Sequence, residues 1–454
     1  MYSPKNIVII GGNAAGPAAA AKAKRVSPDS NVTLFEAGQF ISTGTCELPY
    51  VLSGEITEVK KLVFFDPESF EQKKGVKVYI NHLVEKIDRR NKTITVLNKS
   101  SNQKIDYPYD RLILTTGSKP VYISKFDRTL DNLFTLKSVT DLIRLDKFLS
   151  NNNRIRNVAV IGAGYIGLET AEAFRKKGFS VKLFERENLP LPNTDVEIGN
   201  IIAEILKESN IEFYRQAVDI EPVIQDNTIK AIKHQGWTIE VDMVLLAAGV
   251  KPNNDLAAAA GLTLGEFGGL KVDSRCKTSD PNIFAAGDNV EVKNSITNRY
   301  DYIPLATIAR DYGHIAGENA AGGNATARGI VPNVALKFFD YFIATVGINS
   351  AKARKYNLNF ESVYATAPNL VKVMPGSRNG FGKILFDKYT GNILGAQFIG
   401  GKEVAGHADI VSVLINNKIP VYKLGDVDYN YTPPLSPFIN LLSILGRKAK
   451  EVKK

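Results

Sequence analysis

Two stretches of the chain repeat one pattern of apolar and polar positions. The first covers residues 6–38 (NIVIIGGNAAGPAAAAKAKRVSPDSNVTLFEAG) and the second covers residues 157–187 (NVAVIGAGYIGLETAEAFRKKGFSVKLFERE). Each pattern indicates an apolar strand, a glycine-rich turn, a helix rich in small residues and a second apolar strand that ends in an acid. This order is a βαβ unit, and two such units in one chain predict two dinucleotide-binding sites.

Three later apolar runs predict further core strands, each followed by a turn of small residues; they lie at residues 110–120, 241–253 and 282–291. The last run presents Gly287 and Asp288 at its end. A carboxylate there can hydrogen-bond a ribityl chain, bind a metal or simply end the strand.

The pattern changes beyond residue 325, where apolar and polar residues alternate as in antiparallel strands. A helix is predicted over residues 403–416. The chain is therefore predicted to be α/β in its front part and α+β at its back, with a boundary near residues 322–329.

The second glycine turn carries the complete spacing of a dinucleotide fingerprint, with Gly162, Gly164 and Gly167. The first glycine makes the tight turn, the second lets a pyrophosphate approach the backbone, and the third lets helix pack on strand. The pyrophosphate then meets the free N–H groups at the helix N-terminus. Glu185 ends the following strand, where its carboxylate can accept hydrogen bonds from a ribose hydroxyl.

The first turn departs from that spacing at one position. Gly11 and Gly16 hold the outer positions, Asn13 replaces the middle glycine, and Glu36 is the terminal acid. One such turn is weak support for a nucleotide site because it can be purely structural. Two in tandem, each with its acid, favour two nucleotide sites.

Composition narrows the class of protein. Of the 454 residues, 44% are hydrophobic and 23% are charged, which is ordinary for a globular protein. No apolar run reaches the roughly 18 to 20 residues of a spanning helix, and no cleavage site follows the N-terminal strand. Two cysteines cannot form a disulfide framework, so a reducing, cytoplasmic location is predicted. The net charge of +10 comes from scattered residues, which predicts neither a nucleic-acid nor a membrane partner.

Cys46 is the candidate redox residue. It lies in FISTGTCELPYVLSGEI, where ELPYVLSG predicts a short helix, so its thiol is expected near a helix N-terminus that lowers the pKa. Glu47 is expected to act weakly in the opposite direction. Cys276 has no such setting and is predicted to be structural, and no CxxC or CxxxxC motif provides a dithiol. The four histidines lack the spacing of a metal site, so no metal is predicted, and no GxSxG hydrolase motif occurs.

These motifs together resemble a known family. GGNAAG, GAGYIG, SxxxCxLPY, AAGDN, the segment 304–323 (PLATIARDYGHIAGENAAGG) and YTPP occur in the order found in FAD-dependent pyridine nucleotide-disulfide oxidoreductases. The similarity covers essentially the whole chain. It is greatest to the single-cysteine branch, which comprises coenzyme A-disulfide reductases, NADH oxidases and NADH peroxidases.

The resemblance implies a division into three domains. Residues 1–118 and 250–325 would form an FAD-binding domain, residues 119–249 an NAD(P)-binding domain, and residues 326–454 a C-terminal α+β dimerisation domain. The first two would be Rossmann-like. The third would hold a homodimer together and deliver residues to the partner's active site.

The resemblance also implies which residues bind the cofactors. Those expected to hold FAD are Gly11, Gly12, Ala15, Gly16, Glu36, Thr116, Gly117, Gly287, Asp288 and Ala306. Those expected to hold NADH or NADPH are Gly162, Gly164, Tyr165, Ile166, Gly167, Glu185 and Gly249. Glu185 favours NADH because a carboxylate repels the 2′-phosphate of NADPH, although the neighbouring Arg186 is able to accommodate that phosphate.

Several positions favour a coenzyme A-disulfide reductase. The family's oxidases and peroxidases commonly have a histidine where this chain has Ala14. The reductase pattern implies substrate contacts from Ser42 and Thr45 near Cys46 and from two cations, Arg25 and Lys74, toward the phosphates of coenzyme A. The alternative for Arg25 and Lys74 is a solvated basic face.

Tyr431 matches the reductase tyrosine that reaches the disulfide from the partner chain, where its hydroxyl would donate a proton to the leaving thiolate. Two departures from the pattern occur: Met374 replaces a second tyrosine, and a lysine expected soon after Pro434 is missing.

The resulting hypothesis is a flavoprotein that moves a hydride from NAD(P)H through FAD to a mixed disulfide of Cys46 and coenzyme A. An NADH oxidase or peroxidase that cycles through a Cys46 sulfenic acid is an alternative. An NAD(P)H-dependent persulfide or polysulfide reductase is another. The non-enzymatic alternative is a flavin-based redox sensor or electron-transfer protein.

Overall fold

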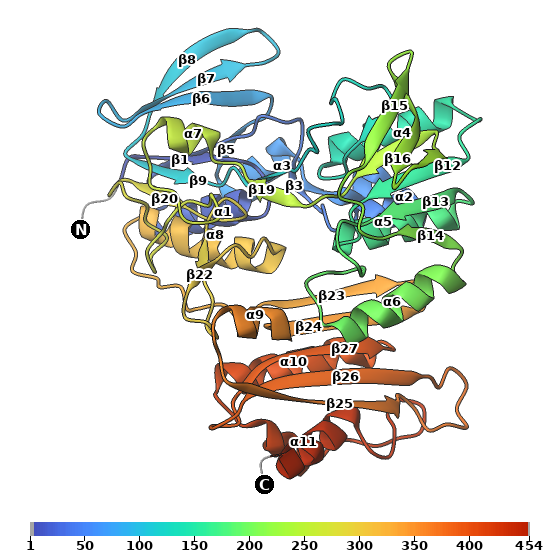
Figure 1. Ribbon diagram of the computed structural model, residues 1–454. Coiled ribbons are helices and arrows are strands. Elements are labelled where there is room, and N and C mark those ends of the chain that lie inside the picture. Colours follow the sequence, from blue (N-terminus) through green and yellow to red (C-terminus); the bar gives the residue numbers. More distant parts are fainter. Residues whose placement is uncertain (1–3, 453–454) are drawn as a thin grey trace.

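The computed structural model describes residues 4–452, which form three units, each built on a five-stranded sheet (Figure 1). The first unit has a parallel sheet in the order β20-β9-β1-β2-β5. Its elements are β1 (Asn6–Ile10), α1 (Ala15–Val26), β2 (Asn31–Phe35), β5 (Lys77–Tyr79), β9 (Arg111–Leu114), β20 (Ile283–Ala285) and α8 (Ala306–Ala320). The central strands are buried on both faces, which explains their continuous apolar sequence.

The second unit repeats this construction in the order β11-β18-β12-β13-β14, again with parallel strands. Its elements are β11 (Leu133–Phe134), α4 (Val139–Asn151), β12 (Asn157–Ile161), α5 (Tyr165–Lys176), β13 (Ser180–Phe184), α6 (Val196–Glu208), β14 (Ile211–Tyr214) and β18 (Met243–Leu246). Both predicted βαβ units are therefore present.

The third unit has an antiparallel sheet in the order β23-β24-β27-β26-β25 and lies at the bottom of Figure 1. Its elements are β23 (Asn333–Phe338), β24 (Tyr341–Gly347), α9 (Ser350–Lys355), β25 (Phe360–Pro368), β26 (Asn379–Asp387), β27 (Ile393–Gly400), α10 (Glu403–Asn416), η2 (Val421–Asp426) and α11 (Leu441–Val452). Helix α10 has the predicted bounds, and the predicted fold class is confirmed.

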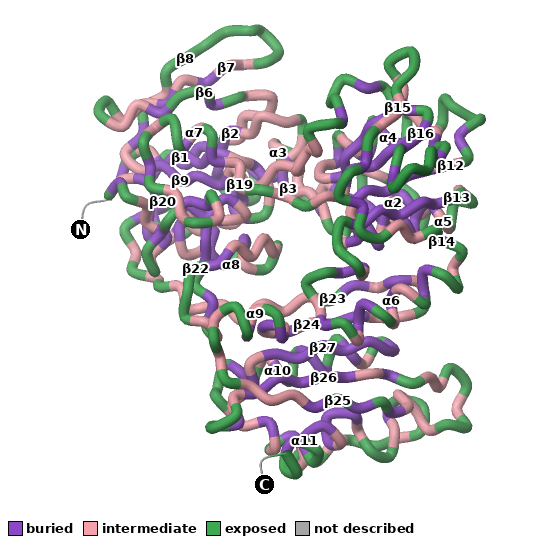
Figure 2. The backbone as a smooth tube through the Cα atoms, viewed as in Figure 1, coloured by how far each residue is buried: buried purple, intermediate pink, exposed green. Residues whose placement is uncertain are grey.

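The sequence patterns did not predict two small antiparallel sheets. One consists of β6 (His82–Asp88), β7 (Thr93–Asn98) and β8 (Gln103–Pro108), and the other of β15 (Glu221–Gln225), β16 (Thr228–His234) and β17 (Trp237–Glu240). Strand β8 is largely exposed and appears green in Figure 2. The remaining elements are β3 (Ile41–Thr43), α2 (Leu48–Ser53), η1 (Val59–Leu62), β4 (Val63–Phe65), α3 (Pro67–Lys74), β10 (Ser118–Pro120), β19 (Val250–Pro252), α7 (Asp255–Ala259), β21 (Val292–Lys293) and β22 (Tyr300–Asp301).

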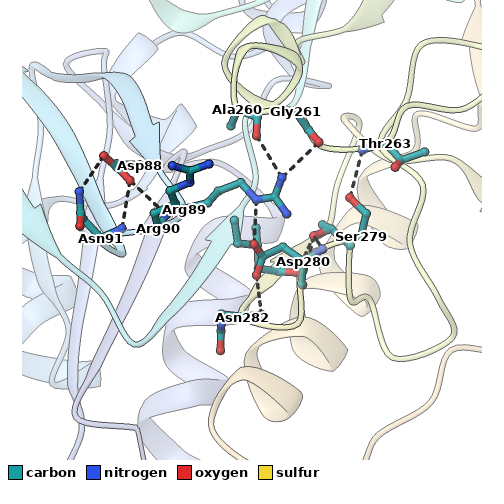
Figure 3. Close-up of polar contacts among 12 residues, drawn as sticks. Asp88, Arg89, Arg90, Asn91, Ala260, Gly261, Thr263, Ser279, Asp280 and Asn282 are labelled. Carbon is teal, nitrogen blue, oxygen red and sulfur yellow. Dashed lines mark hydrogen bonds and ion pairs between the residues drawn. The ribbon is translucent and has the colours of Figure 1, made fainter.

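Arg89 ties distant parts of the chain together within the first unit. It follows β6, donates to the Asp280 carboxylate at 2.8 Å, and reaches the carbonyl oxygens of Ala260 and Gly261 at 3.3 Å (Figure 3). This partly buried ion pair explains how the segment after β19 returns to the first sheet.

Helices α1 and α8 approach unusually closely. A Cβ added at Gly313 would lie 2.5 Å from the Ala15 carbonyl oxygen, and one at Gly317 would lie 2.2 Å from that of Ala19. Because both contacts advance in the same direction, the helices run parallel and their N-termini point the same way. Glycine at these two positions is what lets the helix backbones touch.

A buried ionic cluster joins the second and third units. Lys383 on β26 lies 2.9 Å from a carboxylate oxygen of Asp195 and 2.9 Å from one of Glu197. Asp195 also accepts hydrogen bonds from the Ser350 backbone N–H and hydroxyl. Within residues 4–452, no helix is both long and apolar enough to cross a membrane.

Candidate functional site

The two glycine turns have the same geometry. Gly11 and Gly162 have φ of 109° and 105°, which favours glycine. A Cβ at Gly16 would lie 1.9 Å from the Gly11 carbonyl oxygen, and one at Gly167 would lie 1.8 Å from that of Gly162. In each turn the third glycine therefore allows the close helix-strand contact that the sequence predicted.

The two acids also occupy equivalent places. Glu36 accepts hydrogen bonds from the backbone N–H groups of Gly12 and Gly38, both at 2.6 Å. Glu185 accepts them from Ala163 at 2.7 Å and from Glu187 at 3.0 Å. Each carboxylate is thus held at the tip of its glycine turn, where a ribose is bound in this type of fold.

The two turns differ at the middle position of the glycine motif, which is Asn13 in the first and Gly164 in the second. Nothing lies within 4 Å of a Cβ added at Gly164, the N-cap of α5, so the backbone is open to a ligand. Tyr165 and Ile166 form the first turn of α5, and the Tyr165 hydroxyl lies 3.2 Å from the Thr345 hydroxyl. Gly249 has φ of 96°, and its carbonyl oxygen accepts a hydrogen bond from Val121.

The predicted FAD residues surround the N-terminus of α1. Ala15 begins that helix, and a Cβ at Gly287 would lie 3.1 Å from the Ala15 Cβ. Ala306 begins α8, whose N-terminus points the same way. The strand ends carrying Thr116 and Gly117 are fixed by hydrogen bonds to the Asn253 backbone at 2.7 and 2.9 Å.

The residues present fit an FAD nucleotide on two structural grounds. Nothing lies within 4 Å of a Cβ added at Gly117, so the backbone there is open to a ligand. The N-terminus of α1 has no side-chain cap, so no side chain competes with a pyrophosphate for the N–H groups of its first turn. The buried Tyr302 hydroxyl lies near the same site: burial and then the charge of Asp288 raise its pKa, while a hydrogen bond with Ser118 lowers it.

Asp288 is paired with a residue that the sequence did not single out. Its carboxylate accepts a hydrogen bond from the Ser118 hydroxyl at 2.9 Å and lies 3.3 Å from the Lys137 ammonium group. Lys137 precedes α4, and no glycine or cysteine motif marks it. Its charge also acts on Cys46, so the site brings Cys46, Lys137 and Asp288 together.

Cys46 lies in the turn between β3 and α2 and is exposed, whereas Cys276 is buried. Helix α2 begins at Leu48, so the predicted short helix after Cys46 is present. Two backbone N–H groups fix the preceding strand to the first glycine turn. Ser42 donates to the Gly12 carbonyl oxygen and Thr43 to the Asn13 side-chain oxygen, both at 2.8 Å.

The expectation that the helix lowers the pKa of Cys46 is wrong for the chain itself. Burial, and then the carboxylates of Glu47 and Glu169, raise the pKa of the Cys46 thiol, while Lys137 acts against them. Helix α2 has only six residues, and the negative charges near its start outweigh its dipole.

Glu169 is a second functional candidate that sequence reasoning missed. It lies on α5, which packs against α2, and it is hydrogen-bonded to Tyr50. Burial, and then the charge of Glu172, raise the pKa of Glu169 to about 7. A cavity of about 10 Å³, the size of one water molecule, lies between Tyr50 and Glu169. The position of Glu169, two residues after Gly167, was the one feature of the sequence that could have pointed to it.

Two of the predicted substrate residues, Arg25 and Lys74, are cations in the last turns of helices. Arg25 lies in the last turn of α1, near His314, whose pKa is lowered by burial and then by Arg25, Arg310 and Lys22, while Asp311 raises it. Lys74 ends α3, with its ammonium group 5.7 Å from the centre of the Phe65 ring.

Lys74, Ser42 and Thr45 all lie near the segment that carries Cys46. Phe65 pairs with Ile41 across β3 and β4, which places Lys74 beside the strand that leads to Cys46. Ser42 and Thr45 are half-buried on either side of Gly44.

Tyr431 belongs to the third unit, in the segment between η2 and α11. It is 49% exposed, and its ring contacts Phe438, which is 79% exposed. Helix α11, which follows this segment, lies at the bottom of Figure 1, whereas α2 lies in its upper half. A groove of about 320 Å³ between α6 and the end of β14 contains none of the predicted site residues.

Comparison with known proteins agrees with this architecture. The family model for pyridine nucleotide-disulphide oxidoreductases matches residues 5–313, and the model for the dimerisation domain of those enzymes matches residues 333–441. The NAD(P)H sulfur oxidoreductase (CoA-dependent) of Pyrococcus abyssi is 31% identical over 447 residues and covers 98% of both chains.

Two solved structures are also similar. Reduced CoADR-RHD of Bacillus anthracis has a TM-score of 0.95 and 32% identity, covering 100% of this chain and 81% of that one. The water-forming NADH oxidase from Lactobacillus brevis, bound to NADH, has a TM-score of 0.92 and 28% identity, covering 99% of both chains.

Proposed function

The chain belongs to the pyridine nucleotide-disulphide oxidoreductase family, and on this premise we propose that it reduces coenzyme A disulfide to two coenzyme A thiols. Enzymes of this family use FAD and NAD(P)H. The relatives include a CoA-dependent sulfur oxidoreductase, a CoADR and an NADH oxidase. The choice among these activities depends on the residues around Cys46.

The observation that carries the proposal is the setting of Cys46. It is the one exposed cysteine, since Cys276 is buried, and its strand is hydrogen-bonded to the first glycine turn. A single thiol with no second thiol beside it cannot form an internal disulfide. It is suited to a mixed disulfide with a small thiol.

Ala14 supports a reductase rather than an oxidase. Its methyl group offers no proton to a sulfenate, whereas a histidine at that position would. The same reasoning weakens a peroxidase, because an oxidised sulfur there lacks a hydrogen-bond donor from this side chain.

The first unit is proposed to hold FAD. Its glycine turn and the N-terminus of α1 would take the pyrophosphate, Glu36 the ribose, and Thr116, Gly117 and Asp288 the flavin nucleotide. Gly12, Gly16, Gly287 and Ala306 would form the walls of that site. Bound FAD supplies the transfer of two electrons from the nicotinamide to sulfur.

The second unit is proposed to hold the nicotinamide nucleotide at Gly162, Gly164 and Gly167. Glu185 favours NADH, for its carboxylate repels a 2′-phosphate. The exposed Arg186 pairs with Glu187 at 3.1 Å, which reduces its availability to such a phosphate. Gly249, Tyr165 and Ile166 would complete the site. The functional division at residues 118, 249 and 325 is part of the same proposal.

The cations around His314 support an anionic substrate. Arg25, Arg310 and Lys22 are close enough to depress the pKa of that histidine, while Asp311 raises it. Arg310 pairs with Asp311 at 2.9 Å and Lys22 with Glu318 at 2.8 Å, so Arg25 is the one of these three cations without an ion pair among the described residues. Lys74 adds a further positive charge beside the strand that leads to Cys46. Phosphate groups of coenzyme A would be bound by these cations, with the thiol end directed past Ser42 and Thr45.

The chemistry at sulfur is a thiol-disulfide exchange. The Cys46 thiolate attacks one sulfur of coenzyme A disulfide, the substrate S–S bond breaks, and one coenzyme A thiolate leaves. Addition of two electrons breaks the new Cys46–coenzyme A bond, which returns the Cys46 thiolate and releases the second thiolate. Lys137 favours the thiolate electrostatically.

The third unit is proposed to join two copies of the chain. Tyr431, Leu435 and Phe438 expose large apolar surfaces in one segment, and Val373 does so in another. Burying them in a homodimer would bring Tyr431 toward the partner's Cys46. Its hydroxyl would then donate a proton to a leaving thiolate. A cytoplasmic location remains a prediction that rests on two unpaired cysteines.

The test is anaerobic oxidation of NADH and of NADPH by the FAD-loaded protein, with and without coenzyme A disulfide. We expect turnover that requires the disulfide and is lost in Cys46→Ser, with Cys276→Ser as the matched control. Turnover only with oxygen, peroxide or polysulfide would assign the protein to the corresponding alternative. No turnover with any acceptor would favour a redox sensor.

A further inference from the structure

Asn13 holds the position that Gly164 holds in the second glycine turn. At Gly164 the space beyond the backbone is open. At Asn13 the side chain is half-buried, and its amide oxygen reaches a neighbouring segment. The two turns therefore differ in the one position that faces a bound pyrophosphate.

The segment that Asn13 reaches is the one that carries Cys46. Its side-chain oxygen accepts the backbone N–H of Thr43 at 2.8 Å, three residues before the cysteine. The adjacent Ser42 N–H donates to the Gly12 carbonyl oxygen at 2.8 Å. The two bonds are consecutive along β3, so they fix both the distance and the rotation of that strand.

The backbone on both sides of this contact is constrained. Ala14 has φ of 38° and Ser42 has φ of 51°, values that residues with a Cβ rarely adopt. Such conformations persist when surrounding contacts enforce them. The Asn13–Thr43 hydrogen bond lies between the two and is a contact able to do so.

We propose that Asn13 is a positioning residue that sets the place of Cys46 relative to the cofactor held by the first turn, through its hydrogen bond to the Thr43 N–H. The inference rests on the proposed function only in taking Cys46 as the redox residue. It adds a role for a side chain at a position where the fingerprint calls for none.

The test compares Asn13→Ala with Asn13→Asp, which keeps the acceptor oxygen, in holoprotein with saturating FAD. Asn6→Ala is the matched control, because Asn6 makes an exposed side-chain hydrogen bond to Asn31 at the opposite end of β1. Three properties are measured: hydrogen exchange of the Thr43 amide, the rate of Cys46 alkylation by iodoacetamide at pH 7, and disulfide-dependent kcat with KM for NADH.

We expect Asn13→Ala to speed Thr43 exchange about fivefold, as for loss of one hydrogen bond. Alkylation should become faster, since a loosened strand moves the exposed thiol away from the Glu169 carboxylate, whose charge disfavours the thiolate. The kcat should fall by a similar factor with KM for NADH unchanged. In Asn13→Asp the exchange of the Thr43 amide should stay within about twofold of that in the natural protein, and Asn6→Ala should match the natural protein in all three properties.

Unchanged Thr43 exchange in Asn13→Ala would overturn the proposal. So would faster exchange with unaltered alkylation and kcat, or an Asn13→Asp variant whose Thr43 amide exchanges as fast as that of the alanine variant. Loss of FAD with normal Thr43 exchange would assign Asn13 to cofactor retention instead. If the natural protein reduces no disulfide, the proposed function fails, yet exchange and alkylation still decide the role of Asn13.

Discussion

The second glycine turn offers a pair of substitutions whose effects should separate completely. Gly167→Ala places a methyl group 1.8 Å from the Gly162 carbonyl oxygen, far inside a van der Waals contact. Gly164→Ala places the same methyl group in space that is empty to 4 Å, at a residue with φ of −77° that alanine adopts without strain. Stability should respond to the first substitution and nucleotide binding to the second.

The expected size follows from these contacts. Moving α5 away from β12 far enough to relieve the Gly167→Ala clash should cost about 3 kcal/mol, the upper range for overpacking. About 1 kcal/mol is returned because alanine favours the helix. A net loss of about 2 kcal/mol in the free energy of unfolding is predicted. Gly164→Ala should change it by less than about 1 kcal/mol but weaken NADH binding at least about tenfold.

Two assays are applied separately to both variants. Urea unfolding gives the free energy of unfolding, and anaerobic titration of the folded protein gives the affinity for NADH. Gly164→Ala that binds NADH as tightly as the natural protein would refute the assignment of the pyrophosphate to this turn. Gly167→Ala with an unchanged unfolding midpoint would refute the steric argument, and with it the reason given for glycine at that position.

Three further predictions follow from buried titratable side chains. Burial lowers the pKa of His407 to about 4, so the folded state favours the neutral imidazole. The free energy of unfolding should therefore be at its full value above pH 6.5 and fall by about 3 kcal/mol as the pH drops to 4. In His407→Leu the free energy of unfolding, measured with urea, should depend less on pH over that range. Lys383→Met leaves the buried Asp195 carboxylate without its cation and should lower the free energy of unfolding by about 3–5 kcal/mol. Adding Asp195→Asn should restore part of that loss. If nothing is restored, the two residues are not energetically coupled. Glu169→Gln removes a carboxylate that raises the pKa of Cys46, so the pH profile of Cys46 alkylation should move to lower pH, most clearly above pH 7 where Glu169 ionises; a shift to higher pH would contradict the assigned electrostatics.

What the sequence could predict was local. The two glycine turns, their acids and helix α10 follow from spacing within about 30 residues, and the structure has all of them. The Cys46 loop and the helix after it were predicted for the same reason. The parallel contact of α1 with α8 was not, since Gly313 and Gly317 look like ordinary helix residues until a second helix is placed against them.

The electrostatics of the site could not be predicted in the same way. Lys137, just before α4, and Glu169, on α5, act on Cys46 from segments with no sequence relation to the cysteine. The sequence showed the helix dipole and the neighbouring Glu47 but neither the burial of the thiol nor Glu169, so the predicted direction of the pKa shift was wrong. The proposed contributions of Tyr431 depend on a second chain and remain predictions.

The ionic link through Lys383 has a consequence for how the molecule works over a catalytic cycle. The segment that leaves Glu185, at the proposed ribose site, ends at Asp195, which is bonded to the third unit through buried charges. Rotation of the second unit away from the third would break these contacts and leave charges without partners, which costs several kcal/mol for a buried ion pair. We therefore expect the two units to keep their relative position while dinucleotides enter and leave. We expect the turnover of the protein to depend little on solvent viscosity.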